Sequence, residues 1–208
     1  MRADQKEITN WLSKTIGNNS FNIEELRQEA SDRKYYRIKA DNVSYVLADN
    51  FDKTDQSANF LYASKILKNC SVNVPEVLAF SEDLRFLLLQ DLGDKSLDTD
   101  NEFKDEKILE MALEQLSKIY FSDQDVLRSA TKESLLIQTN SFIDFCKENK
   151  LSNDELKALE NLRNNLVQNL LNQQFIPTHN DFERRNLMMF EEKLFVIGFQ
   201  DLNMGPIG

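Results

Sequence analysis

Apolar residues recur at both helix and strand spacings along the first ninety residues of the chain, and the two spacings alternate. Residues 55–67 have apolar positions on one face of a helix. Asp41-Asn42 is a turn-forming pair and predicts a turn between two strands. The predicted elements are a helix over 5–13, strands over 33–40 and 43–48, a helix over 55–67, and strands over 75–80 and 84–90. This order predicts a small mixed α/β lobe.

The pattern becomes helical after Asp91-Leu92-Gly93-Asp94, which interrupts it. Helices are predicted over 107–121, over 132–148, and from Ser152 onward, where Ser152 and Glu155 form a capping box. The leucine stripe of the third helix fits either a coiled coil or a packed bundle, and its short length favours the bundle. The side chains expected in the core of the first two helices are Ile108, Leu109, Leu113, Leu116, Ile119, Leu135, Leu136, Phe142, Ile143 and Phe145.

These elements predict an α+β fold of the bilobal, protein-kinase-like type. The expected parts are an N-terminal lobe over 1–90, a hinge over 91–98 and a helical C-terminal lobe over 99–208. A chain of 208 residues with 41% hydrophobic content can form such lobes.

The net charge of −10 argues against nonspecific binding of nucleic acid and against adhesion to anionic membranes. Cys70 and Cys146 have neither the spacing of a metal site nor that of a disulfide framework. No signal peptide or membrane-spanning run is seen, so a cytoplasmic protein is expected.

The strongest chemical signal lies near the end of the chain, in T-H-N-D-F-E-R-R-N-L-M-M-F over 178–190. His179, Asp181 and Asn186 match H-x-D-x-x-x-x-N, the pattern of the kinase catalytic loop. Apolar runs over 187–190 and 194–199 flank Glu191-Glu192-Lys193 and predict a hairpin. A hairpin centred on Glu192 places Asn186 opposite residue 198.

Phosphoryl transfer depends mainly on positioning and on charge neutralisation. Asp181 is therefore the candidate catalytic base or acceptor-orienting residue, and Asn186 is a candidate Mg²⁺ ligand. His179 is interpreted as structural, with a catalytic role as the alternative. Arg184 and Arg185 can contact phosphate or substrate, or can simply be solvated.

Further segments carry a family resemblance over nearly the whole chain. They are L-R-Q-E-A-S-D-R-K-Y-Y-R-I, Y-V-L-A-D, V-N-V-P-E-V-L-A-F, F-L-L-L-Q-D-L-G-D and V-I-G-F-Q-D-L-N-M-G-P-I-G. With the catalytic-loop motif, they resemble the aminoglycoside-phosphotransferase-like superfamily. Within it, the chain is most similar to the anomeric N-acetylmuramate/N-acetylglucosamine kinases of bacterial cell-wall recycling.

The resemblance implies ATP and Mg²⁺ as cofactors and a sugar as acceptor. It implies a loop over the nucleotide phosphates at Ala30, Ser31, Asp32 and Arg33, and adenine contacts along the backbone of Gln90, Asp91 and Leu92. Ala48 occupies the position of the protein-kinase strand lysine, and the following helix has no glutamate. Lys34 or Arg37 can compensate, or can be an exposed basic strand edge.

Two departures from the family pattern bear on activity. Gly198 stands where the family has the chief Mg²⁺-binding aspartate, which leaves Asn186 and Asp201 as the candidate metal ligands and predicts impaired magnesium-dependent turnover. The chain also stops at Gly208, before the helices that complete the larger lobe in family members. Uncovered helices predict self-association or marginal stability, and a shortened gene or a piece of a longer protein both fit.

Three hypotheses follow. The first is an ATP-dependent small-molecule kinase acting on a sugar hydroxyl, with Asp181 as base and Asn186 and Asp201 at the metal. The second is a catalytically inactive kinase-like protein that binds nucleotide or a partner. The third is a remnant without activity.

Overall fold

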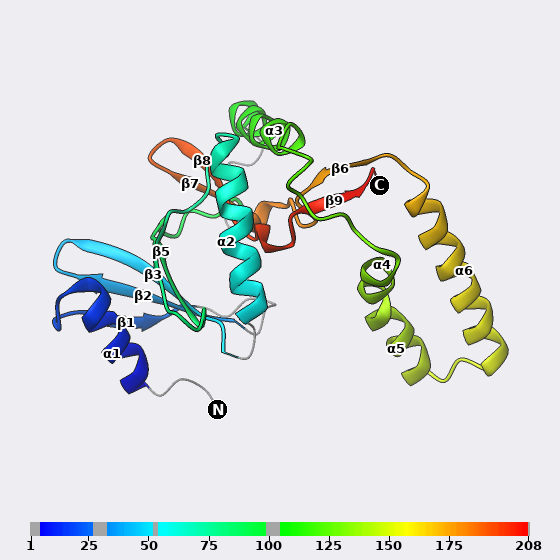
Figure 1. The fold of residues 1–208 in the computed structure, drawn as a ribbon, viewed down its shortest axis with the longest axis horizontal. Helices are drawn as coiled ribbons and strands as arrows, with labels where there is room; N and C mark the ends of the chain where they lie inside the picture. The colour runs from blue at the N-terminus through cyan, green and yellow to red at the C-terminus, as the bar shows by residue number, and fades with distance from the viewer. Residues whose placement is uncertain (1–4, 27–32, 52–53, 99–104, 208) are drawn as a thin grey trace. The chain divides into compact units, whose positions relative to one another are not determined.

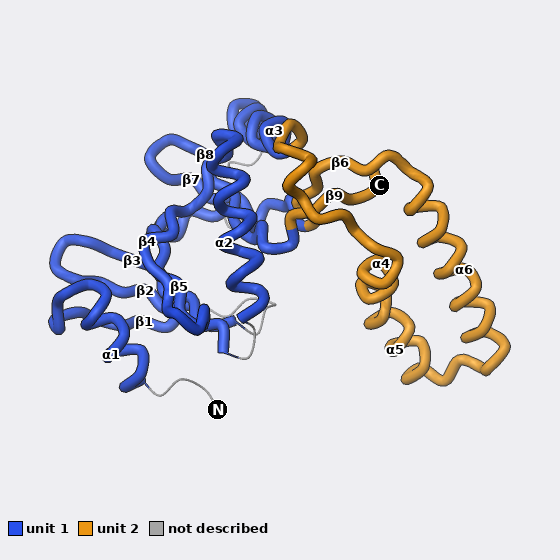
Figure 2. Tube along the Cα trace, in the orientation of Figure 1, with its two compact units in different colours: residues 1–119, 181–201 blue, residues 120–180, 202–208 orange. Residues whose placement is uncertain are grey.

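The computed structural model describes residues 5–26, 33–51, 54–98 and 105–207. It contains two compact units, one formed by residues 1–119 and 181–201 and the other by residues 120–180 and 202–208 (Figure 2). The predicted division into an N-terminal lobe over 1–90, a hinge over 91–98 and a C-terminal lobe over 99–208 stays a prediction.

The first unit is built on a five-stranded antiparallel sheet in the order β1-β2-β3-β5-β4 (Figure 1). Its elements are α1 (Gln5–Ile16), β1 (Asn22–Glu25), β2 (Lys34–Ala40), β3 (Val43–Asp49), α2 (Thr54–Asn69), β4 (Val77–Phe80), β5 (Phe86–Gln90), α3 (Glu106–Tyr120), η2 (Arg184–Asn186), β7 (Leu187–Phe190), β8 (Lys193–Val196) and η3 (Phe199–Asp201). The elements predicted in this unit agree with these bounds to within about three residues, and β1 was not predicted.

Alternation along the strands gives the sheet two different faces. One face packs against α1 through a core in which Trp11 and Phe86 have ring centroids 5.4 Å apart. The buried members of this core are Ile8, Leu12, Ile38, Leu47, Phe86 and Leu88. Strand residues of the opposite parity, such as Arg37 and Ala48, therefore lie on the other face of the sheet.

The second unit contains α4 (Lys132–Gln138), α5 (Asn140–Glu148) and α6 (Asn153–Leu171), with a two-stranded sheet of β6 (Phe175–Thr178) and β9 (Asn203–Pro206). The Ser152–Glu155 capping box is present at the start of α6, as predicted. The guanidinium of Arg163 on α6 donates to Asn140 Oδ1 at 2.6 Å and links α6 to α5. The strands β6 and β9 were not predicted.

The single helix predicted over 132–148 is wrong, because the chain breaks at Thr139. Thr139 ends α4 and precedes α5, with φ −98° and ψ 0°. Its hydroxyl donates to the Leu136 carbonyl oxygen at 2.9 Å. A threonine side chain that bonds the preceding turn competes with the regular helical ladder, and apolar periodicity does not reveal this competition.

Helix burial was predicted only in part. Ile108, Ile119, Leu135 and Ile143 are buried as expected. The expectation is wrong for side chains that the structure leaves exposed, namely Leu109, Leu113, Leu116, Phe142 and Phe145. Among the described residues, no helix is both long enough and apolar enough to cross a bilayer.

Candidate functional site

The candidate site is built on the β7–β8 hairpin, which the rest of the first unit holds on both sides. On one side, the Met189 N–H donates to the Lys95 carbonyl oxygen at 2.9 Å, and the Leu97 N–H donates to the Leu187 carbonyl oxygen at 3.0 Å. On the other side, the Val196 N–H donates to the Asn73 carbonyl oxygen at 2.8 Å. The open end of the hairpin therefore has a fixed position in this unit.

The predicted hairpin is confirmed, but its predicted register is wrong by one residue. Phe190 pairs with Lys193, so the turn contains only Glu191 and Glu192. Asn186 consequently lies opposite Ile197, whose N–H donates to the Asn186 carbonyl oxygen at 2.9 Å. Lys193 had been counted in the turn, although it belongs to β8.

Gly198 nevertheless lies against the Asn186 side chain. A Cβ atom at residue 198 would lie 2.6 Å from Asn186 Oδ1, and Gly198 has φ +71°. This left-handed conformation favours glycine. Asn186 and residue 198 are therefore neighbours, as the sequence predicted. They meet because the Asn186 side chain lies beside Gly198, and they are not paired across the hairpin.

Asp181 and Asn186 form the centre of the site. The Asn186 side-chain amide donates to Asp181 Oδ2 at 2.7 Å and to the Asp181 carbonyl oxygen at 2.8 Å. The short helix η2 makes this approach possible, since the Asn186 N–H donates to the Glu183 carbonyl oxygen at 2.9 Å. Asp181 is exposed, so its carboxylate is accessible to a small molecule while Asn186 holds its orientation.

The segment after Gly198 is anchored to α2. Phe199 is fully buried, and its ring stacks on Phe60 of α2 with centroids 4.6 Å apart. Asp201, at the end of η3, is exposed and accepts a hydrogen bond from the Gln200 side chain at 3.3 Å. The buried aromatic pair therefore fixes the backbone on which both Gly198 and Asp201 lie.

The fit of this site to Mg²⁺ is poor. Mg²⁺ prefers a near-octahedral set of oxygen ligands that includes carboxylates. Residue 198 has no side-chain oxygen, and Asn186 offers a neutral amide. In the part of the chain that the structure describes, no three His, Cys, Asp or Glu side chains are grouped to hold a metal ion. Asn186 and Asp201 stay predicted ligands of an incomplete site.

The segment after β5 is held by Arg37 of β2. The Arg37 guanidinium donates to Asp91 at 2.8 and 3.2 Å, to Asp94 at 3.0 Å and to the Gly93 carbonyl oxygen at 3.1 Å. Ser44 and the Gly93 N–H also donate to the Asp91 carboxylate. Arg37 is thus engaged with the linker, and it is not the exposed strand edge that one interpretation of the sequence proposed.

These contacts change the ionisation of Asp91. Burial opposes its charge, but the hydrogen bonds from Ser44, Gly93 and Arg37 outweigh that effect and lower the pKa of Asp91. Burial likewise opposes the charge of Arg37, and its bonds to Asp91 and Asp94 raise the pKa of Arg37 overall. The Asp91 side chain is therefore committed to the linker, and only its backbone is available to a ligand.

The other nucleotide-contact candidates have different surroundings. Gln90 lies at the end of β5, where its side chain accepts from the Glu76 N–H at 3.2 Å, and Leu92 is buried. Arg33 is also buried, and its Nε donates to Gln56 of α2 at 3.1 Å. Ala30, Ser31 and Asp32 lie outside the described residues.

Four further basic or titratable residues have defined places. His179 is 2% exposed, which fits its interpretation as structural. Arg184 lies 3.8 Å from an Asp98 oxygen, and Arg185 pairs with Glu183; both arginines are exposed. Lys34 pairs with Glu25 at 2.6 Å.

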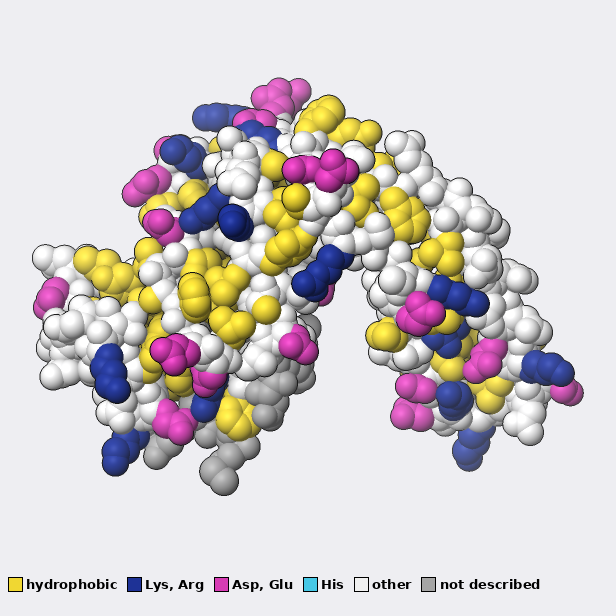
Figure 3. All heavy atoms as spheres, viewed as in Figure 1, with side chains coloured by type: hydrophobic (Ala, Val, Ile, Leu, Met, Phe, Trp, Pro, Cys, Tyr) yellow, Lys and Arg dark blue, Asp and Glu magenta, His cyan; other side chains and the backbone are white. Residues whose placement is uncertain are grey.

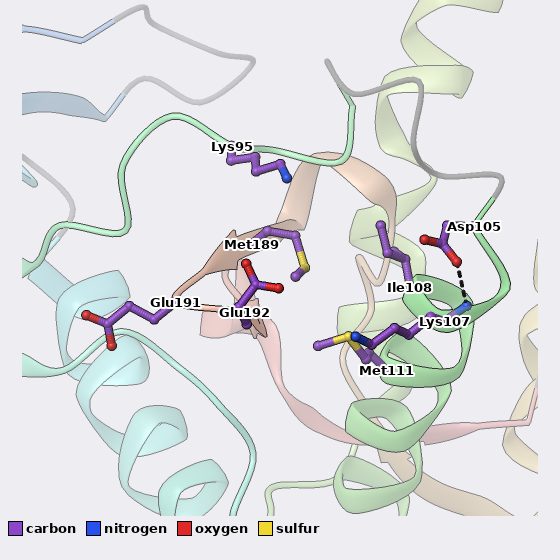
Figure 4. A pocket seen from close by; sticks show the side chains of 8 residues that line it. All are labelled: Lys95, Asp105, Lys107, Ile108, Met111, Met189, Glu191 and Glu192. Carbon is purple, nitrogen blue, oxygen red and sulfur yellow. Dashed lines mark hydrogen bonds between the residues drawn. The ribbon is translucent and has the colours of Figure 1, made fainter.

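A small cavity of about 180 Å³ lies between the β7–β8 turn and α3 (Figure 4). Its lining residues are Lys95, Asp105, Lys107, Ile108, Met111, Met189, Glu191 and Glu192. Because it borders the turn, it lies at the opposite end of the hairpin from Asn186 and Ile197. It is therefore separate from the Asp181–Asn186 site.

Comparison with known proteins agrees with this geometry. Residues 22–208 match the model of the phosphotransferase enzyme family, called APH. The chain belongs to this family. The match includes the sheet, the linker, the Asp181–Asn186 pair and the Gly198 segment. It confirms the family resemblance, and the solved structures described below confirm the kinase-like α+β fold class.

Among curated relatives, the chain is 28% identical to an N-acetylmuramate/N-acetylglucosamine kinase of Neisseria meningitidis, over 98% of this chain and 64% of that protein. It is 29% identical to a protein of the same name from Pseudomonas aeruginosa, over 86% of this chain and 55% of that protein. The chain therefore spans less than two thirds of the length of these relatives.

Solved structures show the same fold. The ADP-bound aminoglycoside phosphotransferase APH(2'')-Ib matches with a TM-score of 0.71 at 21% identity, over 98% of this chain and 73% of that one. The streptomycin–ATP ternary complex of APH(2'')-IIa matches with a TM-score of 0.63 at 20% identity, over 99% of this chain and 74% of that one.

Several contacts of the site have no signal in the sequence. The stacking of Phe199 on Phe60 and the bonds of Ser44 and Arg37 to Asp91 were not predicted. The phenylalanines are separated by more than half of the chain, so no local pattern joins them. The Ser44 contact follows from β3–β5 pairing, in which Tyr45 pairs with Gln90, so that Asp91 comes next to Ser44. Arg37 lies on the neighbouring strand β2, where it pairs with Val46 of β3.

Proposed function

We propose that this chain acts as an ATP-dependent small-molecule phosphotransferase whose acceptor is a hydroxyl group of an amino sugar. The observation that carries the proposal is the bonded pair of Asp181 and Asn186 in a chain of the phosphotransferase family. The names of the curated relatives support an amino-sugar acceptor. Because those relatives are longer, the activity and the acceptor of the whole protein are part of the proposal.

In the proposed reaction, the acceptor oxygen forms a bond to the γ-phosphorus of ATP. The bond from that phosphorus to the β–γ bridging oxygen breaks, and ADP leaves with the electron pair. The acceptor proton passes to the Asp181 carboxylate. The role of Asn186 is to fix that carboxylate, since positioning accounts for much of catalysis in phosphoryl transfer.

The proposal assigns the adenine edge to the backbone of Gln90, Asp91 and Leu92. The four contacts of Arg37 with the linker support this assignment, because a backbone held in one conformation binds a ligand at a lower entropic cost. Arg33 and the neighbouring loop residues Ala30, Ser31 and Asp32 are assigned to the phosphates. Asn186 and Asp201 are the residues assigned to Mg²⁺, and their incomplete oxygen set leads us to propose impaired turnover.

A second candidate function is that of a kinase-like protein that binds nucleotide without transferring phosphate. Gly198 is the observation that favours it, because this position supplies no carboxylate and Asn186 Oδ1 occupies the space beside it. The two candidates share the nucleotide site and differ only in turnover.

Incubation with γ-labelled ATP and a panel of acceptors tests the proposed function. The panel contains N-acetylmuramate, N-acetylglucosamine, aminoglycosides, choline and homoserine, and Asp181→Asn is the control variant. Slow labelling of an amino sugar that Asp181→Asn abolishes is the expected result. A thermal shift with ATP but no labelled product favours the second candidate. Absence of both labelling and a thermal shift contradicts both candidates.

A further inference from the structure

The edge of β8 that faces away from β7 is bonded by one residue, Asn73, which lies in the segment between α2 and β4. The Val196 N–H donates to the Asn73 carbonyl oxygen at 2.8 Å, and the Asn73 side-chain amide donates to the Leu194 carbonyl oxygen at 3.0 Å. A residue of a neighbouring parallel strand would bond these two groups with its own C=O and N–H. Asn73 therefore acts as a single strand residue beside Phe195, with its side-chain amide in the place of its backbone N–H.

The backbone N–H of Asn73 has a different partner, on helix α3. It donates to Gln115 Oε1 at 2.8 Å, and Gln115 is 2% exposed. The neighbours of Asn73 along the chain, Val72 and Val74, are also buried. An unpaired amide N–H in such surroundings is unfavourable. Gln115 is thus the acceptor that allows Asn73 to use its side chain on β8.

The segment around Asn73 is held on both sides. Before it, the Val72 N–H donates to the Leu67 carbonyl oxygen of α2 at 3.0 Å. After it, the Gln90 N–H of β5 donates to the Glu76 carbonyl oxygen at 2.8 Å. Asn73 consequently has a fixed place between α2, β5 and α3, which all belong to the first unit (Figure 1).

The bonded part of β8 leads directly to the candidate catalytic pair. Ile197 is the next residue, and its N–H donates to the Asn186 carbonyl oxygen at 2.9 Å. Gly198 then lies against the Asn186 side chain, whose amide donates to Asp181 Oδ2 at 2.7 Å. The path from α3 to Asp181 therefore consists of hydrogen bonds and one short stretch of β8.

We infer that Asn73 and Gln115 are positioning residues for Asp181. Together they fix the edge of β8 and, through it, the Asn186 side chain that orients the Asp181 carboxylate. This inference rests on the proposed function for the role of Asp181, and it adds that α3 and the segment before β4 set the alignment of the catalytic pair. Alignment matters because a displacement of about 1 Å costs about a hundredfold in rate.

Asn73→Asp tests the inference in the transfer assay. The variant keeps the size and the carbonyl oxygen of residue 73, but it places a carboxylate oxygen against the Leu194 carbonyl oxygen. The kcat for transfer from γ-labelled ATP is expected to fall about tenfold or more with the KM for ATP unchanged, because alignment is lost and nucleotide binding is not. Asn69→Asp is the matched control, since Asn69 is exposed at the end of α2, and it is expected to match the wild type.

Amide NMR spectra of the folded chain test the same inference without turnover. Asn73→Asp and Gln115→Met are expected to shift the signal of the Asn186 side-chain amide, and Asn69→Asp is expected to leave it in place. Methionine is similar to glutamine in length but is a poor acceptor. Gln115→Met is the decisive variant, because residue 115 lies on α3 and reaches β8 through Asn73. It also decides the question alone if Asn73→Asp does not fold.

An unshifted Asn186 signal in Gln115→Met would overturn the inference, even with a lower thermal midpoint, because Gln115 would then only stabilise the fold. Unchanged kcat in both variants would also overturn it and would leave the proposed transferase intact. A shifted Asn186 signal in both variants of a chain that transfers no phosphate would support the positioning role and would count only against the transferase.

Discussion

Asn186 Oδ1 lies 2.6 Å from the point where a Cβ atom of residue 198 would stand. Any side chain at residue 198 therefore displaces the Asn186 amide, which is also bonded to Asp181. Residue 198 is consequently coupled to the proposed catalytic carboxylate through one side chain.

The first prediction concerns stability. Gly198→Ala is expected to reduce the free energy of unfolding by about 2 kcal/mol, of which about 1 kcal/mol comes from the left-handed backbone and about 1 kcal/mol from displaced hydrogen bonds of Asn186. Urea denaturation measures the difference. In an Asn186→Ala background the same change is expected to cost about 1 kcal/mol, since the contact is gone. An equal cost in both backgrounds would show that Asn186 is not involved.

The second prediction concerns activity at the same position. Gly198→Asp displaces the Asn186 amide, as any side chain at residue 198 does. It is nevertheless expected to raise magnesium-dependent phosphate transfer above that of the wild-type chain, because the carboxylate that it supplies to the metal outweighs that displacement. Gly198→Asn is the matched control, with the same size and no charge, and it is expected to be no faster than the wild type, because it displaces Asn186 without supplying a charged ligand. Labelled-ATP assays over a range of Mg²⁺ concentrations measure the effect. Comparable robust activity in the wild type and Gly198→Asp would refute the idea.

The third prediction concerns the linker. The lowered pKa of Asp91 means that its ionised form is stabilised by folding, so it contributes stability above the pKa of an unfolded aspartate, about 3.9, and loses it as the pH falls through the lower folded-state pKa. Asp91→Asn is expected to cost about 1.5–3 kcal/mol near pH 7, because Arg37 and Ser44 lose a charged partner.

Denaturant unfolding of both chains from pH 7 to pH 3 tests this prediction. The difference between wild type and Asp91→Asn is expected to shrink below about pH 4. Glu155 also has a lowered pKa, caused first by the hydrogen bond from the Ser152 side chain. Because Glu155 lies at the start of α6 in the other unit and is unchanged in Asp91→Asn, its titration affects both chains equally and cancels in their difference. A difference that stays constant with pH would contradict a role for the Asp91 charge.

The fourth prediction concerns the β7–β8 turn. Glu191 and Glu192 both have positive φ, 48° and 59°, which is unfavourable for residues with a Cβ atom. Replacement of the pair by Asn-Gly is expected to stabilise the chain by about 1 kcal/mol. Glu191→Ala/Glu192→Ala removes the same two charges but keeps the backbone strain. A similar gain in that control would assign the effect to charge and not to conformation.

The sequence alone predicts what depends on local patterns. The β7–β8 hairpin, the Ser152 capping box and the sheet hairpin at Asp41-Asn42 each have a local signal, and each is present. The register error at Asn186 arose because the hairpin signal does not determine how many residues the turn contains. One residue of turn length changes every cross-strand partner.

The features that sequence analysis missed depend on distant partners. The sequence left open whether Arg37 contacts phosphate or is an exposed strand residue. Its partners Asp91 and Asp94 are more than fifty residues away along the chain and become neighbours only in the folded structure. The β6–β9 pair contains Pro177, Gly205 and Pro206, which are typical of loops, so its pairing had no recognisable pattern. The exposed leucines of α3 have the same periodicity as buried ones, because periodicity identifies a common face but not what covers it.

The fifth prediction concerns that face of α3. Leu109, Leu113 and Leu116 follow helical spacing and are 47%, 56% and 40% exposed. Hydrophobic side chains are also visible on the molecular surface in Figure 3. Apolar side chains in contact with water on one helix face favour association, so the 208-residue chain is expected to self-associate at micromolar concentrations through a second copy.

Sedimentation velocity of the wild type and Leu113→Glu tests this expectation. The variant is expected to shift the distribution toward the monomer, because a charge at the centre of the face must be desolvated on association. Glu110→Gln on the same helix is the control, and it is expected to behave like the wild type, since Glu110 is already exposed. A wild-type chain that is a single monomeric species with a high thermal midpoint would contradict the prediction, because an uncovered apolar face would then have no measurable consequence.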